Sequence, residues 1–390
     1  MYDNLFVFFV VGLLNAIYCS WLQTMTQNWL DITLENAAQS ILELTSLQIG
    51  LDFSNLQELS RTIVTNQFGI TGILEVQLMS EGSQQGYSIG FIAKQIYNDK
   101  SYYKHVINTS ENFLNLLESR QSQWESIKRS INQNEIKKYN FPDSIFAPRL
   151  QTKDDETYII QFEILPRFIS RPKSGVSPES RYSLAGYALS RMHGFQEPQP
   201  LTRDYSEWFP FLHSLDIEKE EINNWKHVLE SSKGGLEFGF GEYSLNSVQY
   251  NALVPGKGRL DSLTLIDPIL NAGSDRTDDL GFLLSTIAEK YVENALRKAD
   301  PQNISTRQIL SQALDQLLVK SAPKILNSYT LLYPKLKELY SSNMIPVDFF
   351  AGVYLLNRSQ SGENKKLCDI LSVLGTQLIE SHPISEMILK

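Results

Sequence analysis

Acidic and amide side chains follow one another at short intervals between residues 238 and 267, and their types suit phosphoryl transfer. Glu242 follows a glycine on a predicted loop, the amides Asn246 and Asn251 come next, and an apolar run ends in Asp267. Transfer from a nucleotide requires one carboxylate to orient the attacking hydroxyl. It also requires an amide and a second carboxylate to hold Mg²⁺ against the phosphates. These four residues occur in the order that such a site needs.

The strands and helices that must position these residues can be predicted from the sequence, and they indicate an α+β fold. Strand segments are recognised by their β-branched and aromatic residues and by the turns between them. The predicted strands occupy residues 61–79, 86–97, 144–150 and 157–165, with turns at 81–86 and 153–156. A capped amphipathic helix is predicted over residues 109–130, with Thr109 or Ser110 as its N-cap.

The second half of the chain is predicted to be mostly helical after a proline-rich connector near residues 166–178. The predicted helices are 177–194, 204–232, 277–298, 304–320, 322–341, 344–357 and 363–381, and a strand-rich island at 245–267 interrupts them. A small antiparallel sheet with one helix, followed by a larger helical region, is typical of the bilobal kinase architecture. The predicted parts are an extension (1–55), a small lobe (56–165) and a helical lobe (166–390).

The N-terminal stretch 5–22 is apolar, and its role stays open. Its unbroken part, residues 5–14, is shorter than the ~18–20 residues that a membrane-spanning helix needs, and no Lys or Arg precedes it. A weak membrane anchor, a cleaved signal and a helix buried in protein all fit, and a further helix is predicted over 29–49. We expect a cytoplasmic protein, with weak membrane association through residues 5–22 as one option.

Composition excludes several classes of protein. The net charge of −9 argues against non-specific nucleic-acid binding. The two cysteines, Cys19 and Cys368, cannot form a disulfide framework, and the five histidines contain no H-x-x-x-H pair. A structural metal site of cysteine or histidine is therefore not expected.

Several motifs occur together in a characteristic order. They are "IGFIAKQI" at 89–96, "YIIQFEIL" at 158–165, "GYALSRMHGF" at 186–195, "FGE" at 240–242, "LID" at 265–267 and "DDLG" at 278–281. This ordered set resembles the aminoglycoside phosphotransferase and choline kinase group of the protein-kinase-like superfamily, over roughly residues 60–360. The resemblance implies a bilobal kinase-like fold and an ATP- and Mg²⁺-dependent transfer to a hydroxyl of a small molecule.

The resemblance also implies roles for residues that bind ATP. Lys94 would hold the α- and β-phosphates, with Glu111 as its ion-pair partner. The remaining contacts would be Gly69 and Gly72 over the phosphates, and Glu163 to Leu165 against the adenine.

For the catalytic residues, the resemblance makes Glu242 the base that accepts the hydroxyl proton. Asp267 would bind Mg²⁺ with Asn246 or Asn251, and Asp279 would hold the backbone of the catalytic loop.

The sequence departs from the family pattern at three positions. Phe240 replaces the usual histidine, Glu242 replaces the usual aspartate, and Ser247 stands where the family has its metal-binding asparagine. A pseudokinase that keeps the fold as a binding or scaffold module is therefore the alternative to the enzyme. A protein kinase proper is disfavoured because the chain lacks an A-P-E segment.

Other residues have structural alternatives to a functional role. Lys94 could be a surface lysine of a strand, Asp267 a turn residue, and Glu111 a helix-N-terminal acid. His193 is predicted to be a packed core histidine, and core packing is favoured for Trp208, Phe209 and Phe211. A cluster of acids could attract a cationic acceptor or simply form a solvated helix face: Asp204, Glu207, Asp216, Glu218, Glu220 and Glu221.

Overall fold

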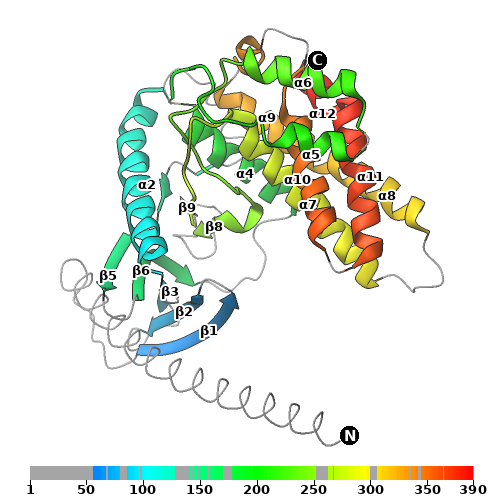
Figure 1. The fold of residues 1–390 in the computed structure, drawn as a ribbon. Helices are drawn as coiled ribbons and strands as arrows, with labels where there is room; N and C mark the ends of the chain where they lie inside the picture. The colour runs from blue at the N-terminus through cyan, green and yellow to red at the C-terminus, as the bar shows by residue number, and fades with distance from the viewer. Residues whose placement is uncertain are drawn as a thin grey trace, which may run out of the picture. The chain divides into compact units, whose positions relative to one another are not determined.

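The structure is a computed structural model. It describes residues 56–66, 69–79, 86–96, 99–127, 141–142, 144–147, 149–155, 159–169, 178–194, 196–215, 217–251, 262–266, 268–298, 305–333, 335–340, 344–362 and 364–389. These residues form two compact units, and each is considered separately (Figure 1). Unit 1 comprises the described residues up to Lys104 together with Arg149–Ile169, and unit 2 comprises the rest. The predicted segments 5–22 and 29–49 lie outside the described residues.

Unit 1 is built around a five-stranded antiparallel sheet with the order β1-β2-β3-β6-β5. Its strands are β1 (Leu56–Asn66), β2 (Gly69–Met79), β3 (Gly86–Ile96), β5 (Arg149–Asp154) and β6 (Ile159–Ile169). The predicted hairpin of the second and third of these strands is confirmed, because β2 and β3 pair from Gly69↔Ile96 to Met79↔Gly86. The α+β class is likewise confirmed.

The prediction of one strand over residues 61–79 is wrong. This segment contributes to two strands, β1 and β2, which pair with each other up to Asn66↔Gly69. The β-branched residues on both sides of the connection hide the turn in the sequence. A single strand of that length would also exceed the usual 3–10 residues, so folding it back gives each half a partner.

Strand β6 runs beyond the predicted end at residue 165 and includes Pro166. The register with β3 shifts between Ser88 and Gly90, which face Arg167 and Ile164 respectively. The shift lies opposite the proline. Since proline has no N–H to donate to a ladder, an irregularity is where a sheet tolerates it.

Unit 2 is mainly helical and contains two small sheets, β4-β9-β8 and β10-β7. Its helices are α4 (Pro178–His193), α5 (Trp208–Ser214), α6 (Lys219–Glu230), α7 (Arg276–Lys298), α8 (Thr306–Asp315), α9 (Ala322–Leu332), α10 (Val347–Ser361), α11 (Lys365–Ser381) and α12 (Pro383–Leu389), with a π-helical turn at Gln316–Ser321 and 3-10 turns at Leu245–Ser247 and Leu336–Leu339. Its short strands are β4 (Ser144–Phe146), β7 (Phe238–Gly239), β8 (Val248–Asn251), β9 (Ser262–Leu265) and β10 (Asn271–Ala272). Helices α7, α10 and α11 pack side by side (Figure 1).

Helix α2 (Lys100–Ile127) begins nine residues before the predicted start at Thr109. The side chain of Asp99 accepts a hydrogen bond from the backbone N–H of Tyr102 at 2.8 Å, which satisfies one free amide of the first turn. Tyr103 and Ile107 are buried at helical spacing, so the extra turns have an apolar face of their own. The predicted cap is wrong for this reason, and most of the helix belongs to unit 2.

The predicted helix 204–232 is also wrong as one element, since it is divided into α5 and α6. The chain leaves α5 at Leu215, and α6 starts after Glu218, whose backbone is extended with ψ near 131°. The break lets Trp208 stack on Phe349 while Trp225 lies buried against the same ring. Core packing of Trp208, Phe209 and Phe211 is thereby confirmed.

In the part of the chain that the structure describes, no helix combines the length and the apolar character needed to cross a bilayer.

Candidate functional site

Glu242 lies on a tight loop between β7 and the 3-10 turn at Leu245–Ser247. Its side chain is exposed, whereas Phe240 and Gly241 before it are buried. Two consecutive residues have left-handed backbone, Gly241 with φ 73° and Glu242 with φ 49°. A residue other than glycine costs energy in this conformation, and such strain clusters at functional sites.

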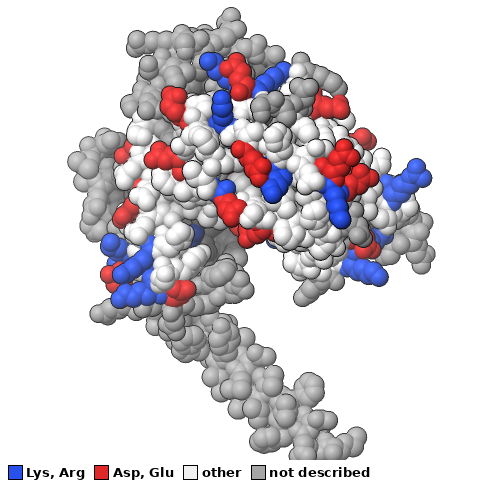
Figure 2. All heavy atoms as spheres, turned by 45° about the horizontal axis from the view of Figure 1, so that its top comes forward, with Lys and Arg blue, Asp and Glu red and all other residues white. Residues whose placement is uncertain are grey.

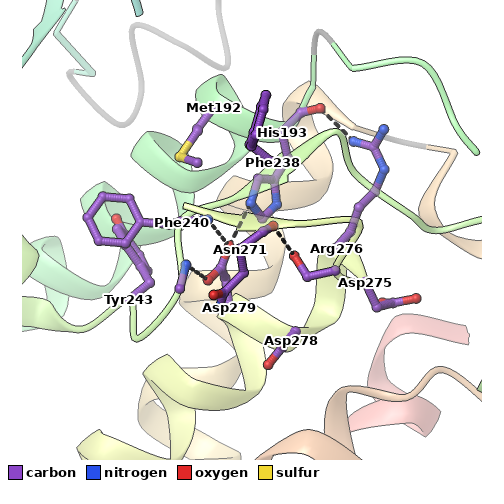
Figure 3. A network of polar contacts seen from close by, with 12 residues as sticks. Met192, His193, Phe238, Phe240, Tyr243, Asn271, Asp275, Arg276, Asp278 and Asp279 are labelled. Atoms are coloured by element: carbon purple, nitrogen blue, oxygen red, sulfur yellow. Dashed lines mark hydrogen bonds and ion pairs between the residues drawn. The ribbon is translucent and has the colours of Figure 1, made fainter. Parts of the chain in front are cut away.

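Asp279, in the first turn of α7, holds this loop in place (Figure 3). Its Oδ2 accepts a hydrogen bond from the backbone N–H of Phe240 at 2.6 Å, and its Oδ1 accepts one from Gly241 at 2.7 Å. The carboxylate is buried, so both bonds are shielded from water. The predicted structural role of Asp279 is confirmed.

Aromatic packing holds the loop from its other side. The ring of Phe240 meets Phe113 of α2 edge-on at 5.5 Å and Tyr243 at 5.0 Å between centroids. The hydroxyl of Tyr243 donates to the carbonyl of Ala185 on α4 at 2.8 Å. Position 240 therefore serves packing in this protein.

The same loop is bound to the chain on both sides of Asp267. The carbonyl of Ser247 accepts the N–H of Ile266, and the carbonyl of Phe240 accepts the N–H groups of Ile269 and Leu270, each at 2.9 Å. Asp267 itself lies outside the described residues. Its two flanking segments nevertheless pack against the loop that presents Glu242.

The two candidate metal-binding amides differ in position. Asn246 is exposed on the 3-10 turn beside Ser247, whereas Asn251 ends β8 and pairs with Ser262. Val248, at the other end of β8, pairs with Leu265 just before Asp267. Asn251 thus lies three residues farther along, about 10 Å at the usual rise of a strand.

Ser247 is buried and serves as part of a cap. Its hydroxyl accepts the N–H of Ser244 at 3.2 Å, while the side chain of Ser244 accepts the N–H of Asn246. This reciprocal pair closes the turn that follows Glu242.

Three buried charged residues at the start of α7 were not predicted from the sequence. Asp275 accepts hydrogen bonds from Tyr340 at 2.7 Å and Ser232 at 2.8 Å, and Arg276 donates to the carbonyls of His193 at 2.5 Å and Gln196. Their sequence, "DRTDD", suggests an exposed charged turn, because charge runs are commonly solvated. Tertiary packing against other segments, among them the end of α4, Ser232 and Tyr340, buries this stretch.

Asp278 is the third of these residues. It accepts hydrogen bonds from Tyr205 at 2.9 Å and Tyr354 at 2.6 Å and faces Arg203 at 3.4 Å. Burial, and then the neighbouring carboxylate of Asp279, raises the pKa of Asp278 to about 7. Burial likewise raises the pKa of the Tyr205 hydroxyl, which therefore remains a hydrogen-bond donor.

The residues predicted to bind ATP lie mostly in unit 1. Gly69 opens β2 directly after the β1–β2 connection, and Gly72 pairs with Ala93, the neighbour of Lys94. Lys94 is partly buried in β3, between Thr71 of β2 and Ile160 of β6. These three residues therefore share one region of the sheet.

The remaining predicted ATP contacts are on β6 and α2. Glu163 pairs with Phe91 of β3, and Leu165 follows two residues later in β6. Glu111 is exposed on the part of α2 that belongs to unit 2. Its ion pair with Lys94 of unit 1 stays a prediction.

His193, at the end of α4, is fully buried, which confirms that it is a packed core histidine. Each of its ring nitrogens has a polar partner, as considered below.

Most of the described acidic residues in 204–221 are exposed, and Asp216 lies outside the described residues. Figure 2 shows acidic side chains interspersed with Lys and Arg on the face it draws. Glu221 pairs with His382 at 2.6 Å, and Lys226 faces Glu230 at 3.9 Å one turn later. The exposure of Asp204, Glu207, Glu218 and Glu220 favours a solvated face, and a cationic acceptor stays a prediction.

Among the described residues, no three acidic, histidine or cysteine side chains gather in a way that could hold a metal ion; Asp267 is outside this set. In comparisons with known proteins, no family model and no curated protein sequence matches the chain.

Proposed function

We propose that the protein is an ATP- and Mg²⁺-dependent phosphotransferase with a kinase-like fold that acts on a hydroxyl of a small molecule. The observation that carries this proposal is the exposed Glu242 on a left-handed loop that Asp279 holds from α7. A carboxylate presented in this way can orient a substrate hydroxyl and accept its proton. Strain at an exposed residue is otherwise difficult to explain, because the side chain gains no burial from it.

The proposed metal ligands are Asp267 and Asn246. The hydrogen bond from Ile266 to Ser247 supports this pair, since it joins the neighbours of the two residues. Asn251 is the weaker candidate because it pairs with Ser262 at one end of β8–β9, whereas Leu265, close to Asp267, pairs with Val248 at the other end. Carboxylate and amide oxygens are the ligands that Mg²⁺ prefers, and the ion would neutralise charge on the phosphates.

The proposed ATP-binding residues are Lys94, Gly69 and Gly72, and their pairing in adjacent strands supports this assignment. In kinases a lysine of the third strand binds phosphates that a glycine-containing turn covers. Along the chain, α2 lies between β3 and β5, and this order of elements is compatible with the small lobe of a kinase. Glu111 would orient the ammonium group of Lys94, and backbone groups from Glu163 to Leu165 would contact the adenine.

The test is the thermal stability of the whole chain with ATP, in the presence and absence of Mg²⁺. A ligand at 100 times its Kd stabilises the folded state by about 2.7 kcal/mol. We expect stabilisation that depends on Mg²⁺ and slow ATP hydrolysis, both of which Asp267→Ala removes. The exposed Asp369→Ala on α11 is the matched control and should change neither.

A second candidate is a pseudokinase that keeps the fold as a binding or scaffold module and does not transfer phosphate. The buried, capping Ser247 favours it, because its hydroxyl is already used by Ser244 and is not directed to a metal ion. Stabilisation by ATP that is indifferent to Mg²⁺, without hydrolysis, would select this function. The absence of any stabilisation by ATP would reject the phosphotransferase and a nucleotide-binding pseudokinase.

A further inference from the structure

His193 connects three helices through its ring. Its Nε2 lies 3.0 Å from Oδ2 of Asp279 on α7 (Figure 3). Its Nδ1 lies 3.0 Å from the hydroxyl of Tyr329 on α9. The His193 and Tyr329 rings meet edge-on at 5.8 Å, and both side chains are fully buried. The same Asp279 carboxylate holds the loop before Glu242.

The hydrogen-bond directions follow from counting donors. An ionised carboxylate can only accept, and Asp279 already accepts from the N–H groups of Phe240 and Gly241. His193 must therefore donate from Nε2. In a neutral imidazole Nδ1 is then an acceptor, so the hydroxyl of Tyr329 must donate to it.

Two neighbouring groups bear on this arrangement. Burial raises the pKa of the Tyr329 hydroxyl, so it keeps the proton that it must donate. The guanidinium of Arg276 donates to the backbone carbonyl of His193 at 2.5 Å, which fixes the end of α4 that carries the ring.

We propose that His193 and Tyr329 are positioning residues for Glu242. A directed chain of hydrogen bonds runs from the Tyr329 hydroxyl through the neutral, Nε2-protonated ring of His193 to Asp279. It fixes the carboxylate so that both of its oxygens face the loop amides. The hydrogen-bond chain exists whether or not the protein is an enzyme. Only the expected effect of these residues on turnover rests on the proposed function.

The first measurement uses the unmodified protein. In ¹⁵N-histidine NMR spectra at pH 7, we expect His193 to carry its proton on Nε2 and an unprotonated Nδ1. A spectrum with the proton on Nδ1, or on both nitrogens, would overturn the proposal. This result does not depend on any ligand or on activity.

The second measurement is hydrogen exchange of the peptide that contains Phe240 and Gly241. We expect exchange to accelerate about five- to tenfold in Tyr329→Phe, in line with the loss of one buried hydrogen bond, and more in His193→Leu. His193→Gln keeps a donor for Asp279 and should recover part of the protection. The matched control is Ser328→Ala, because this buried hydroxyl bonds only to carbonyls of its own helix in the described structure.

Equal exchange in His193→Leu and His193→Gln, or an effect of Ser328→Ala as large as that of Tyr329→Phe, would contradict the proposal. If the wild-type protein does not transfer phosphate, the proposed function fails while these two measurements still decide the hydrogen-bond chain. If it does, Tyr329→Phe should lower kcat and leave the KM for ATP unchanged.

Discussion

Two buried carboxylates in unit 2 hold backbone in the same way but to different ends. Asp279 accepts hydrogen bonds from the consecutive amides of residues 240–241, and Asp348 accepts them from the consecutive amides of residues 384–385. The first pair leads into an exposed loop, whereas the second begins helix α12. The same arrangement of hydrogen bonds therefore supports a candidate active-site loop and the start of a helix.

The residues beside these amides show what differs. Glu242 and His382 both have left-handed backbone, with φ 49° and 50°. His382 gains compensating contacts, since its Nε2 lies 2.6 Å from Glu221 and its ring meets Trp225 edge-on at 4.9 Å. Glu242 instead directs its carboxylate into solvent. Backbone strain that is not compensated by packing contacts indicates a role other than stabilising the fold.

The largest expected effect is on catalysis, and it is expected only in the Glu242 region and not in the Asp348 region. Glu242→Gln removes the proposed base, so kcat should fall about 10²- to 10⁴-fold. Because the side chain is exposed, the free energy of unfolding should change by less than about 0.5 kcal/mol. Steady-state kinetics and urea denaturation measure both, and unchanged kcat would reject Glu242 as the base. Asp348→Asn should leave kcat as it is.

The next effect concerns the carboxylate that holds the loop. In Asp279→Asn one oxygen becomes an NH₂ group, although all three partners, the amides of Phe240 and Gly241 and the ring of His193, are donors. One donor is left facing another, which should lower the free energy of unfolding by about 1–3 kcal/mol. We also expect kcat to fall by about tenfold or more, and denaturation with kinetics on the same sample checks both. A variant as stable and as active as wild type would show that the loop does not need this carboxylate.

The third prediction is a pH dependence that belongs to Asp348. Burial raises its pKa from 3.8 to about 7, against the opposing effect of the two backbone N–H groups. Between about pH 4 and pH 7 the folded state therefore binds a proton that the unfolded chain has released. The contribution of this residue to the free energy of unfolding falls as pH rises through that window, and it becomes constant above pH 7.

Comparing wild type with Asp348→Asn isolates this contribution, because other buried acids such as Asp278 titrate in both proteins. We expect the unfolding free energy of wild type minus that of Asp348→Asn to fall with rising pH, by up to about 1.4 kcal/mol per pH unit. The exposed Asp369→Asn should track wild type at every pH. A difference that is flat, or that rises with pH, would contradict the prediction.

The smallest effect tests the strain itself. Glycine adopts left-handed backbone without cost, so Glu242→Gly should raise the free energy of unfolding by a few tenths to about 1 kcal/mol, partly offset by the freer unfolded chain. His382→Gly relieves the same strain but loses the contacts to Glu221 and Trp225, so it should lower the free energy. Thermal denaturation of the two variants compares their signs. The same sign in both would mean that the two regions do not differ as described.

Much of the α+β organisation was predictable because it depends on local pattern. Helical spacing of apolar residues identified α4, α7 and α11 to within a few residues. Boundaries were missed where a local signal was ambiguous. The turn before Gly69 lies between two β-branched runs, and the cap at Asp99 precedes a polar-looking turn whose Tyr103 is buried only by tertiary packing.

The candidate site was predictable in part for a related reason. Glu242 was selected from residue type and order, and its role stays a prediction. The resemblance pointed to Asp279, and the hydrogen bonds to the amides of Phe240 and Gly241 confirm its structural role. Burial of Asp275, Arg276 and Asp278 could not be read from "DRTDD", since the same letters serve equally well on a solvated helix start.

The amino-acid sequence by itself determined the class of fold, the net negative charge and which residues are candidates for phosphoryl transfer, because side-chain type and spacing along the chain are local properties. Tertiary structure alone decided which carboxylate is solvated at Glu242 and which is enclosed at Asp279. The reason is physical: hydrogen-bond partners and exposure depend on segments dozens of residues apart. Only folding brings His193 within 3.0 Å of both Asp279 and Tyr329.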